Sequence, residues 1–124
     1  MPPVRDAVIL FGHGSRDPLW RQPIDAVAVR LRARHPGLRV ECAFLELTAP
    51  DLPAVGAALA AEGARQVVIV PMFLGTGRHA REDLPLLVAQ LRERHPTTQF
   101  GLQTAIGEDP RVLDLLAEIA AETL

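Results

Sequence analysis

VVIVPMFLGTGRHAREDLP, residues Val67 to Pro85, is the stretch that decides the fold. Its first four residues are β-branched and apolar, which predicts a buried strand over about 66–72. Glycines then open a polar loop that presents Arg78 and His79. Leucine and valine recur at helical spacing from about Arg81 to Arg94, which predicts a helix. The stretch is therefore a strand, a polar loop and a helix in succession.

Outward from this stretch, the same order of strand, loop and helix repeats along the chain. Strands are predicted over 4–11, 38–44 and 98–103. The helix predicted over about 20–34 has Pro18 in its first turn, with Asp17 or Ser15 as its cap. A second helix is predicted from Thr48 to about 61, and a last one from Asp109 to the C-terminus.

The helix ends carry their own signals. Thr48, with an acid three residues on, resembles a capping arrangement, and Gly63 is a natural stop for the second helix. The segment LRARHP at 31–36 recurs as LRERHP at 91–96, 60 residues later. This echo indicates either an ancient duplication or convergent helix-ending chemistry, with His35 and His95 as helix stops. The last helix has an apolar side made of Val112, Leu115, Leu116 and Ile119.

The alternation of strands and helices predicts an α/β fold, a single doubly wound domain over residues 1–124. Right-handed crossovers favour a four-stranded parallel sheet in the order 2-1-3-4, flanked by helices. Ligands of such sheets bind beyond the carboxyl ends of the strands, at the point where the strand order reverses. The loops after the first and third strands, which carry His13 and His79, flank that point.

Composition excludes several classes of protein. The net charge is −2, which does not fit a nucleic-acid binder. The single Cys42 excludes an internal disulfide framework and a cysteine-only zinc site. No secretory signal is visible and no apolar run reaches the ~18 residues of a membrane span. We therefore expect a soluble, cytoplasmic protein with no membrane or nucleic-acid partner.

Two loop histidines are the candidate functional residues. His13 lies between two glycines directly after a buried strand, and His79 lies in a comparable loop. Their neutral nitrogens could bind a divalent first-row metal, and Glu46, at the end of the second strand, could add a carboxylate. The alternative is that all three are ordinary polar loop residues. Glu82 and Asp83 are more simply acids of a first helical turn.

The same loops hold Arg16, Arg78 and Arg81, which indicates an anionic ligand, unless these are solvated loop charges. Glycine-rich loops can also bind phosphate at helix N-termini. The loop Gly75-Thr76-Gly77 is no P-loop, however, because the chain has no lysine.

Three segments together resemble one family. FGHGSRDP at 11–18, FLEL at 44–47 and VPMFLGTGRHAREDLP at 70–85 are similar to the small CbiX/SirB-type sirohydrochlorin chelatases. The resemblance covers essentially the whole chain, in order. It implies insertion of a divalent metal, cobalt foremost or else iron or nickel, into sirohydrochlorin, on the route to cobalamin, siroheme or a nickel tetrapyrrole. It also implies no organic cofactor.

The resemblance also implies roles for residues. His13 and His79 would bind the metal and assist removal of the pyrrole protons, with Glu46 as a further metal ligand. The carboxylates that edge the substrate ring suit the candidate substrate-binding residues: Arg16, Arg78, Arg81, Gly75, Thr76 and Gly77. Short members pair as homodimers across a shared cleft. The alternatives are a non-catalytic metal or tetrapyrrole carrier and a flavodoxin-like phosphate- or nucleotide-binding module.

Overall fold

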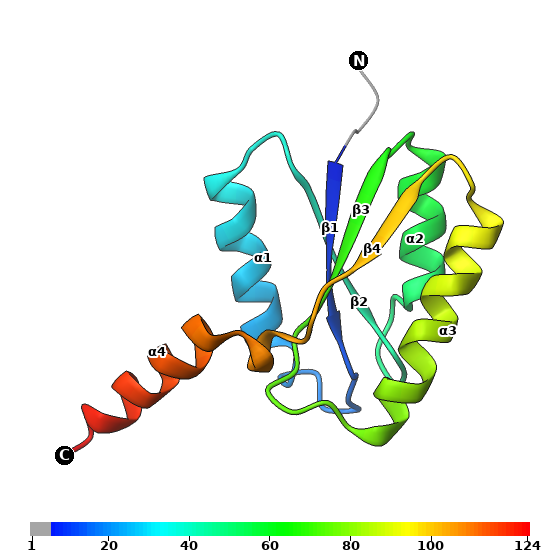
Figure 1. Cartoon of the computed structure of the whole chain (residues 1–124). Coiled ribbons are helices and arrows are strands. Elements are labelled where there is room, and N and C mark those ends of the chain that lie inside the picture. Colours follow the sequence, from blue (N-terminus) through cyan, green and yellow to red (C-terminus); the bar gives the residue numbers. More distant parts are fainter. Residues whose placement is uncertain (1–5) are drawn as a thin grey trace.

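The computed structural model describes residues 6–124 and contains a parallel sheet in the order β2-β1-β3-β4 (Figure 1). This confirms the predicted α/β fold and strand order. The first predicted strand began at Val4, and its first two residues, Val4 and Arg5, lie outside the described residues. The elements in chain order are β1 (Asp6–Gly12), α1 (Gln22–Arg34), β2 (Arg39–Phe44), α2 (Leu52–Ala61), β3 (Gln66–Pro71), α3 (Arg78–Arg94), β4 (Gln99–Leu102), η1 (Ile106–Glu108) and α4 (Pro110–Ala121).

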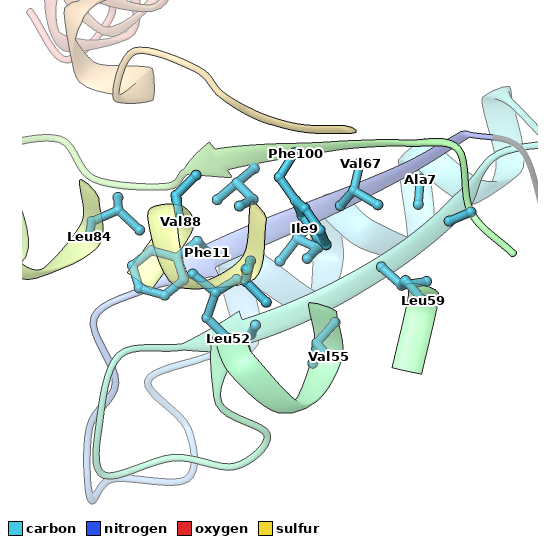
Figure 2. Packing of buried hydrophobic residues seen from close by; sticks show 14 of the residues in the cluster. Ala7, Ile9, Phe11, Leu52, Val55, Leu59, Val67, Leu84, Val88 and Phe100 are labelled. Atoms are coloured by element: carbon cyan, nitrogen blue, oxygen red, sulfur yellow. The ribbon is translucent and has the colours of Figure 1, made fainter. Parts of the chain in front are cut away.

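The sheet separates two layers of helix. α2 and α3 pack together on one face, and α1 covers β1 and β2 on the other. Figure 2 shows the larger core, in which Ile9, Phe11 and Val67 face Leu52 and Val88, all at most 1% exposed. Each such side chain contributes about 1.5–3 kcal/mol by leaving water. This core holds the central strands, whose carboxyl ends carry the candidate residues.

The second helix is capped by a different residue from the one predicted. The Asp51 carboxylate accepts the Ala54 N–H at 2.9 Å, so Asp51 begins α2 and the prediction of Thr48 as the cap is wrong. Thr48 is instead engaged with the loop after β1. Gly63 adopts φ 86° just after α2, which confirms it as the stop because such a backbone favours glycine.

The first helix starts later than predicted. α1 begins at Gln22, and the predicted cap residues serve a turn in front of it. The Asp17 carboxylate accepts the Leu19 N–H at 2.9 Å, and the Ser15 hydroxyl accepts the Asp17 N–H at 3.1 Å. Short polar side chains of this kind stabilise turns as readily as helix starts, which is why the boundary was misplaced.

The repeated LRxRHP segment has the same structure in both places. His35 and His95 end α1 and α3, and each backbone N–H donates to a helix carbonyl at 3.0 Å. Arg32 and Arg92 each donate to a carbonyl of the strand that follows, at 2.6 Å and 2.9 Å. The segment therefore ends a helix and joins it to the next strand, as the helix-stop interpretation predicts.

The last helix departs from the predicted arrangement. α4 does not return to the sheet, and none of its residues is buried. In Figure 1 it leaves η1 and points away from the sheet. Only its start is as predicted: the Asp109 carboxylate accepts the Arg111 N–H at 2.9 Å. Among residues 6–124, no helix combines the length and apolar character needed to cross a membrane.

Candidate functional site

The site begins where β1 and β2 end side by side. The strand pairing continues past both strands, because the Leu45 N–H donates to Gly12 at 3.0 Å and the Glu46 N–H donates to His13 at 3.1 Å. These bonds put the His13 and Glu46 side chains together, with His13 Nε2 and Glu46 Oε1 3.1 Å apart. Both are partly open to solvent, at 41% and 45% exposure.

The spacing of this pair suits a shared metal ion. Two ligand atoms at about 2.1 Å from one ion, at right angles to each other, lie about 3.0 Å apart. The 3.1 Å between His13 Nε2 and Glu46 Oε1 is close to that value. A divalent ion bound by both atoms would lie to one side of the line that joins them, so each side chain would have to turn toward it while the distance between the two atoms is kept. Imidazole and carboxylate together accept first-row metals.

Glycine is required beside His13 because another loop approaches it. Gly14 has φ 105°, and a Cβ there would overlap the backbone carbonyl of Glu46. A Cβ on Gly12 would come within 2.8 Å of Ile24. Glycines on either side of a candidate ligand residue can leave room for a ligand to approach the backbone. The structure shows that the neighbouring loop and α1 occupy that room, which fixes His13 against Glu46.

A hydrogen-bonded clamp joins the same two loops. Thr48 Oγ1 accepts the Ser15 N–H at 3.0 Å and donates to the Ser15 carbonyl at 2.8 Å. Both partners are half-buried, so water competes weakly for these bonds. The two residues are 33 positions apart. No local pattern could have revealed the clamp, and the sequence instead predicted a helix cap at Thr48.

Arg21 supports the Glu46 loop from behind. Its guanidinium donates to both carboxylate oxygens of Asp25, at 2.9 Å and 3.0 Å, and to the Ala49 carbonyl at 3.2 Å. The hydrogen bond to Asp25 is the main cause that raises the pKa of Arg21, so the side chain stays charged. It also lies 4.6 Å from the centre of the Phe44 ring. No local sequence pattern indicates this support.

His79 occupies a helix rather than the predicted loop. α3 begins at Arg78, three residues earlier than predicted, so Arg78 and His79 form its first turn. Gly77 precedes the helix in an extended conformation and provides no side-chain cap. Within residues 6–124, no three histidine, cysteine, aspartate or glutamate side chains lie close enough to hold a metal. The structure thus pairs His13 with Glu46 and leaves His79 outside that pair.

The predicted anion-binding residues are spread over the same edge. Arg78 donates to Glu82 at 3.1 Å, and both side chains are largely exposed. Arg16 is exposed in the loop after β1. Thr76 and Arg81 line a hollow of about 190 Å³ between the start of α3 and the end of β4. Gly75 and Gly77 are exposed beside it. These residues therefore surround the edge without converging on one point.

Comparison with known proteins gives one consistent result. The CbiX family model matches residues 7–123. A sirohydrochlorin cobaltochelatase of Methanococcus aeolicus is 33% identical over 91 residues, 73% of this chain and 64% of that protein. A sirohydrochlorin ferrochelatase of Priestia megaterium is 32% identical over 121 residues, 95% of this chain and 44% of that protein. This chain thus spans less than two thirds of each of these relatives.

One solved structure superposes on this chain over nearly the full length of both. A Marinobacter aquaeolei VT8 protein described as a cobalamin biosynthesis CbiX protein superposes with a TM-score of 0.82 at 28% identity. The match covers 95% of this chain and 96% of that one. At this likeness the two chains share one fold.

Proposed function

The chain belongs to the CbiX family, and from that premise we propose that it inserts a divalent metal ion into sirohydrochlorin. The observation that carries the proposal is the His13–Glu46 pair, with ligand atoms 3.1 Å apart at the carboxyl edge of the sheet. Related proteins named as cobaltochelatase and ferrochelatase support this reaction. They favour cobalt or iron, and nickel stays a third candidate. No organic cofactor is needed for this reaction.

In the proposed mechanism His13 and Glu46 bind the incoming metal from the protein side. Two pyrrole protons must leave the macrocycle as the metal enters, and imidazole is a suitable base because its ordinary pKa is near neutral. When His13 Nε2 carries the ring proton, it donates a hydrogen bond to Glu46 Oε1 and the free lone pair is on Nδ1, so Nε2 would have to lose that proton before it could bind the metal. His79, on the neighbouring helix, is the second proposed base and ligand.

The substrate would be held by charge. Sirohydrochlorin carries many carboxylates, and arginine binds carboxylates through its planar guanidinium. Arg16, Arg78 and Arg81 are the proposed partners, with the loop from Gly75 to Gly77 beside them. Arg78 would exchange Glu82 for the substrate, which is favourable because an exposed ion pair contributes only about 0–1 kcal/mol.

We further propose one domain per chain, paired as a homodimer. The Priestia megaterium relative is about twice as long as the segment it shares with this chain, which supports a site built from two such units. In that arrangement a second copy would face the His13 edge across a cleft. A cytoplasmic location stays a prediction.

Substitution of the proposed ligands tests the function. Purified His13→Ala, His79→Ala and Glu46→Ala variants are given sirohydrochlorin with Co²⁺, Fe²⁺ or Ni²⁺, and insertion is recorded as the absorbance change. We expect loss of turnover in both histidine variants with the circular dichroism spectrum unchanged. Insertion at wild-type rates in both would refute the assignment. A carrier would stop at one equivalent, and a nucleotide-binding module would show a thermal shift with nucleotide or flavin instead.

A further inference from the structure

A strained turn connects Glu46 to the clamp between the two loops. Within residues 6–124, Leu47 is the one residue other than glycine with a positive φ, at 62°. The Thr48 N–H donates to the Glu46 carbonyl at 2.7 Å, which closes a three-residue turn with Leu47 at its centre. Turns of this size with a positive φ are rare and strained. The turn would therefore relax if its ends were free to move.

Both ends of this turn are held by the loop after β1. At the first end, the Glu46 N–H donates to the His13 carbonyl at 3.1 Å. At the second end, Thr48 Oγ1 accepts the Ser15 N–H at 3.0 Å and donates to the Ser15 carbonyl at 2.8 Å. A strained backbone persists only where the surrounding structure over-determines it. The Thr48 hydroxyl makes two of these three hydrogen bonds, so it is the main contact that holds the turn.

The loop after β1 has a matching bend. Gly14, at φ 105°, lies between His13 and Ser15. The strained turn has the same order, with a proposed metal ligand first, a residue of positive φ second and a clamped residue third. The clamp thus lies two residues beyond each ligand and joins the two loops at the same level.

Packing contributes little to the position of Glu46. Its side chain is 45% exposed, and the neighbouring Leu47 is 56% exposed. Arg21 supports the same loop, but it donates to the Ala49 carbonyl, which comes after the turn. Hydrogen bonds to the loop after β1 are therefore what fixes the turn itself.

We propose that Thr48 is a positioning residue, whose clamp on Ser15 keeps His13 and Glu46 at the spacing that a shared metal ion needs. Without the hydroxyl, the strained turn can relax, and the pair is joined by one backbone hydrogen bond beside solvent. The two side chains would then sample many separations, and an incoming metal would have to order them as it binds, which lowers its affinity. The inference rests on the proposed function and assigns the geometry of its metal pair to a residue that need not touch the metal.

Thr98 provides a matched control for a purely structural role. Its hydroxyl donates to the Ala64 carbonyl at 2.9 Å, across 34 residues, and the side chain is buried. It precedes β4, so it lies at the edge of the sheet opposite the candidate site. Thr98→Val thus removes a threonine hydroxyl that joins distant segments of the backbone, as Thr48→Val does, but far from the metal pair.

Calorimetric titration with Co²⁺ alone tests this role on the full chain. Thr48→Val keeps the shape of the side chain and removes the hydroxyl, and Thr48→Ser keeps the hydroxyl. We expect Thr48→Val to raise the dissociation constant for Co²⁺ by about 10–100-fold, as loss of a group that orients metal ligands does. Thr48→Ser and Thr98→Val should bind Co²⁺ as the wild type does. Circular dichroism confirms folding, and Thr48→Ala is read in the same way if the valine variant does not fold.

Three results would each overturn the role of Thr48. They are wild-type cobalt affinity in Thr48→Val, an equal loss of affinity in Thr98→Val, and no recovery in Thr48→Ser.

Metal insertion, assayed on the same proteins, separates this inference from the proposed function. A wild type that binds Co²⁺ but inserts none into sirohydrochlorin would overturn the proposed function alone, because calorimetry still reports on Thr48. Insertion by the wild type together with unchanged cobalt binding in Thr48→Val would overturn the role of Thr48 alone. A wild type that binds no Co²⁺ would overturn both.

Discussion

Replacing Gly14 by alanine is the change that should most directly separate the position of His13 from its chemistry. Gly14 has φ 105°, and an added Cβ would lie within 2.8 Å of the Glu46 carbonyl carbon and would overlap its oxygen. Backbone cannot rotate away as a flexible side chain could. The variant must therefore push the two loops apart, although every side chain of the proposed metal pair is still present.

The cost follows from the bonds that must break. A non-glycine residue forced into such a backbone conformation costs about 1–3 kcal/mol. Separation of the loops also strains the Glu46 N–H bond to His13 and the Thr48 bonds to Ser15, at about 1 kcal/mol each. We expect the free energy of unfolding to fall by about 4–6 kcal/mol. The distance between His13 Nε2 and Glu46 Oε1 would no longer be that of two ligands of one ion.

Urea unfolding and calorimetric titration with Co²⁺ alone measure the two effects. Gly37→Ala is the matched control, since nothing lies within 4 Å of its added Cβ. It should keep wild-type stability within about 0.5 kcal/mol and wild-type cobalt binding. A Gly14→Ala variant that kept both properties would refute the argument that the Glu46 loop fixes His13. Loss of stability with unchanged cobalt binding would instead show that the pair does not hold the metal.

Three further outcomes follow from the structure. Leu52→Ala, at a fully buried position, should lower the free energy of unfolding in urea by about 2–5 kcal/mol, whereas Leu86→Ala should change it by less than about 0.5 kcal/mol. Burial raises the pKa of the Cys42 thiol, so it should react slowly with Ellman's reagent until denaturant is added; fast reaction in the native state would contradict this. Hydrogen bonds from Arg111 lower the pKa of Asp109 from 3.8 to about 2, so its carboxylate stabilises α4 above the higher value. This contribution to the stability of α4 should disappear as the pH falls from 3.8 toward about 2. Circular dichroism should then show a loss of helix in the wild type that the Asp109→Asn variant does not show.

The parallel sheet could be predicted because its signals are local. The β-branched run at 67–70 and the glycine at Gly63 each act within a few residues, and right-handed crossovers then leave few strand orders. The approach of His13 to Glu46 also follows from topology, since both residues come directly after paired strands. What topology cannot give is the contact itself, which depends on Gly14 and on strand pairing that continues past the strand ends.

The contacts that hold the site could not be predicted, because they join residues that are far apart in the sequence. Thr48 meets Ser15 across 33 residues, and Arg21 meets the Ala49 carbonyl across 28. Neither has a sequence signature, because a threonine before an acid is read more naturally as a helix cap. His79 was misplaced through a boundary error, since its polar first turn resembles a loop.

The last helix illustrates a third kind of limit. An apolar side every three to four residues indicates that α4 must pack against something, and the natural inference was its own sheet. The periodicity does not state where that surface lies. The direction of α4 depends on the turn around Gly107, which contacts the loop after β3, and no pattern in α4 records these contacts.

Stability alone does not account for the way His13 and Glu46 are held together. Both side chains are more than 40% exposed, and a pair so open to solvent contributes about 0–1 kcal/mol. Yet the chain keeps Leu47 at φ 62°, beside Glu46, which costs about 1–3 kcal/mol for a residue other than glycine. A strained backbone next to a weak, solvent-facing pair costs more than the pair returns in folding. The arrangement is therefore consistent with the metal-binding role proposed for the pair, and cobalt binding by Leu47→Gly should be retained while its stability is unchanged or higher.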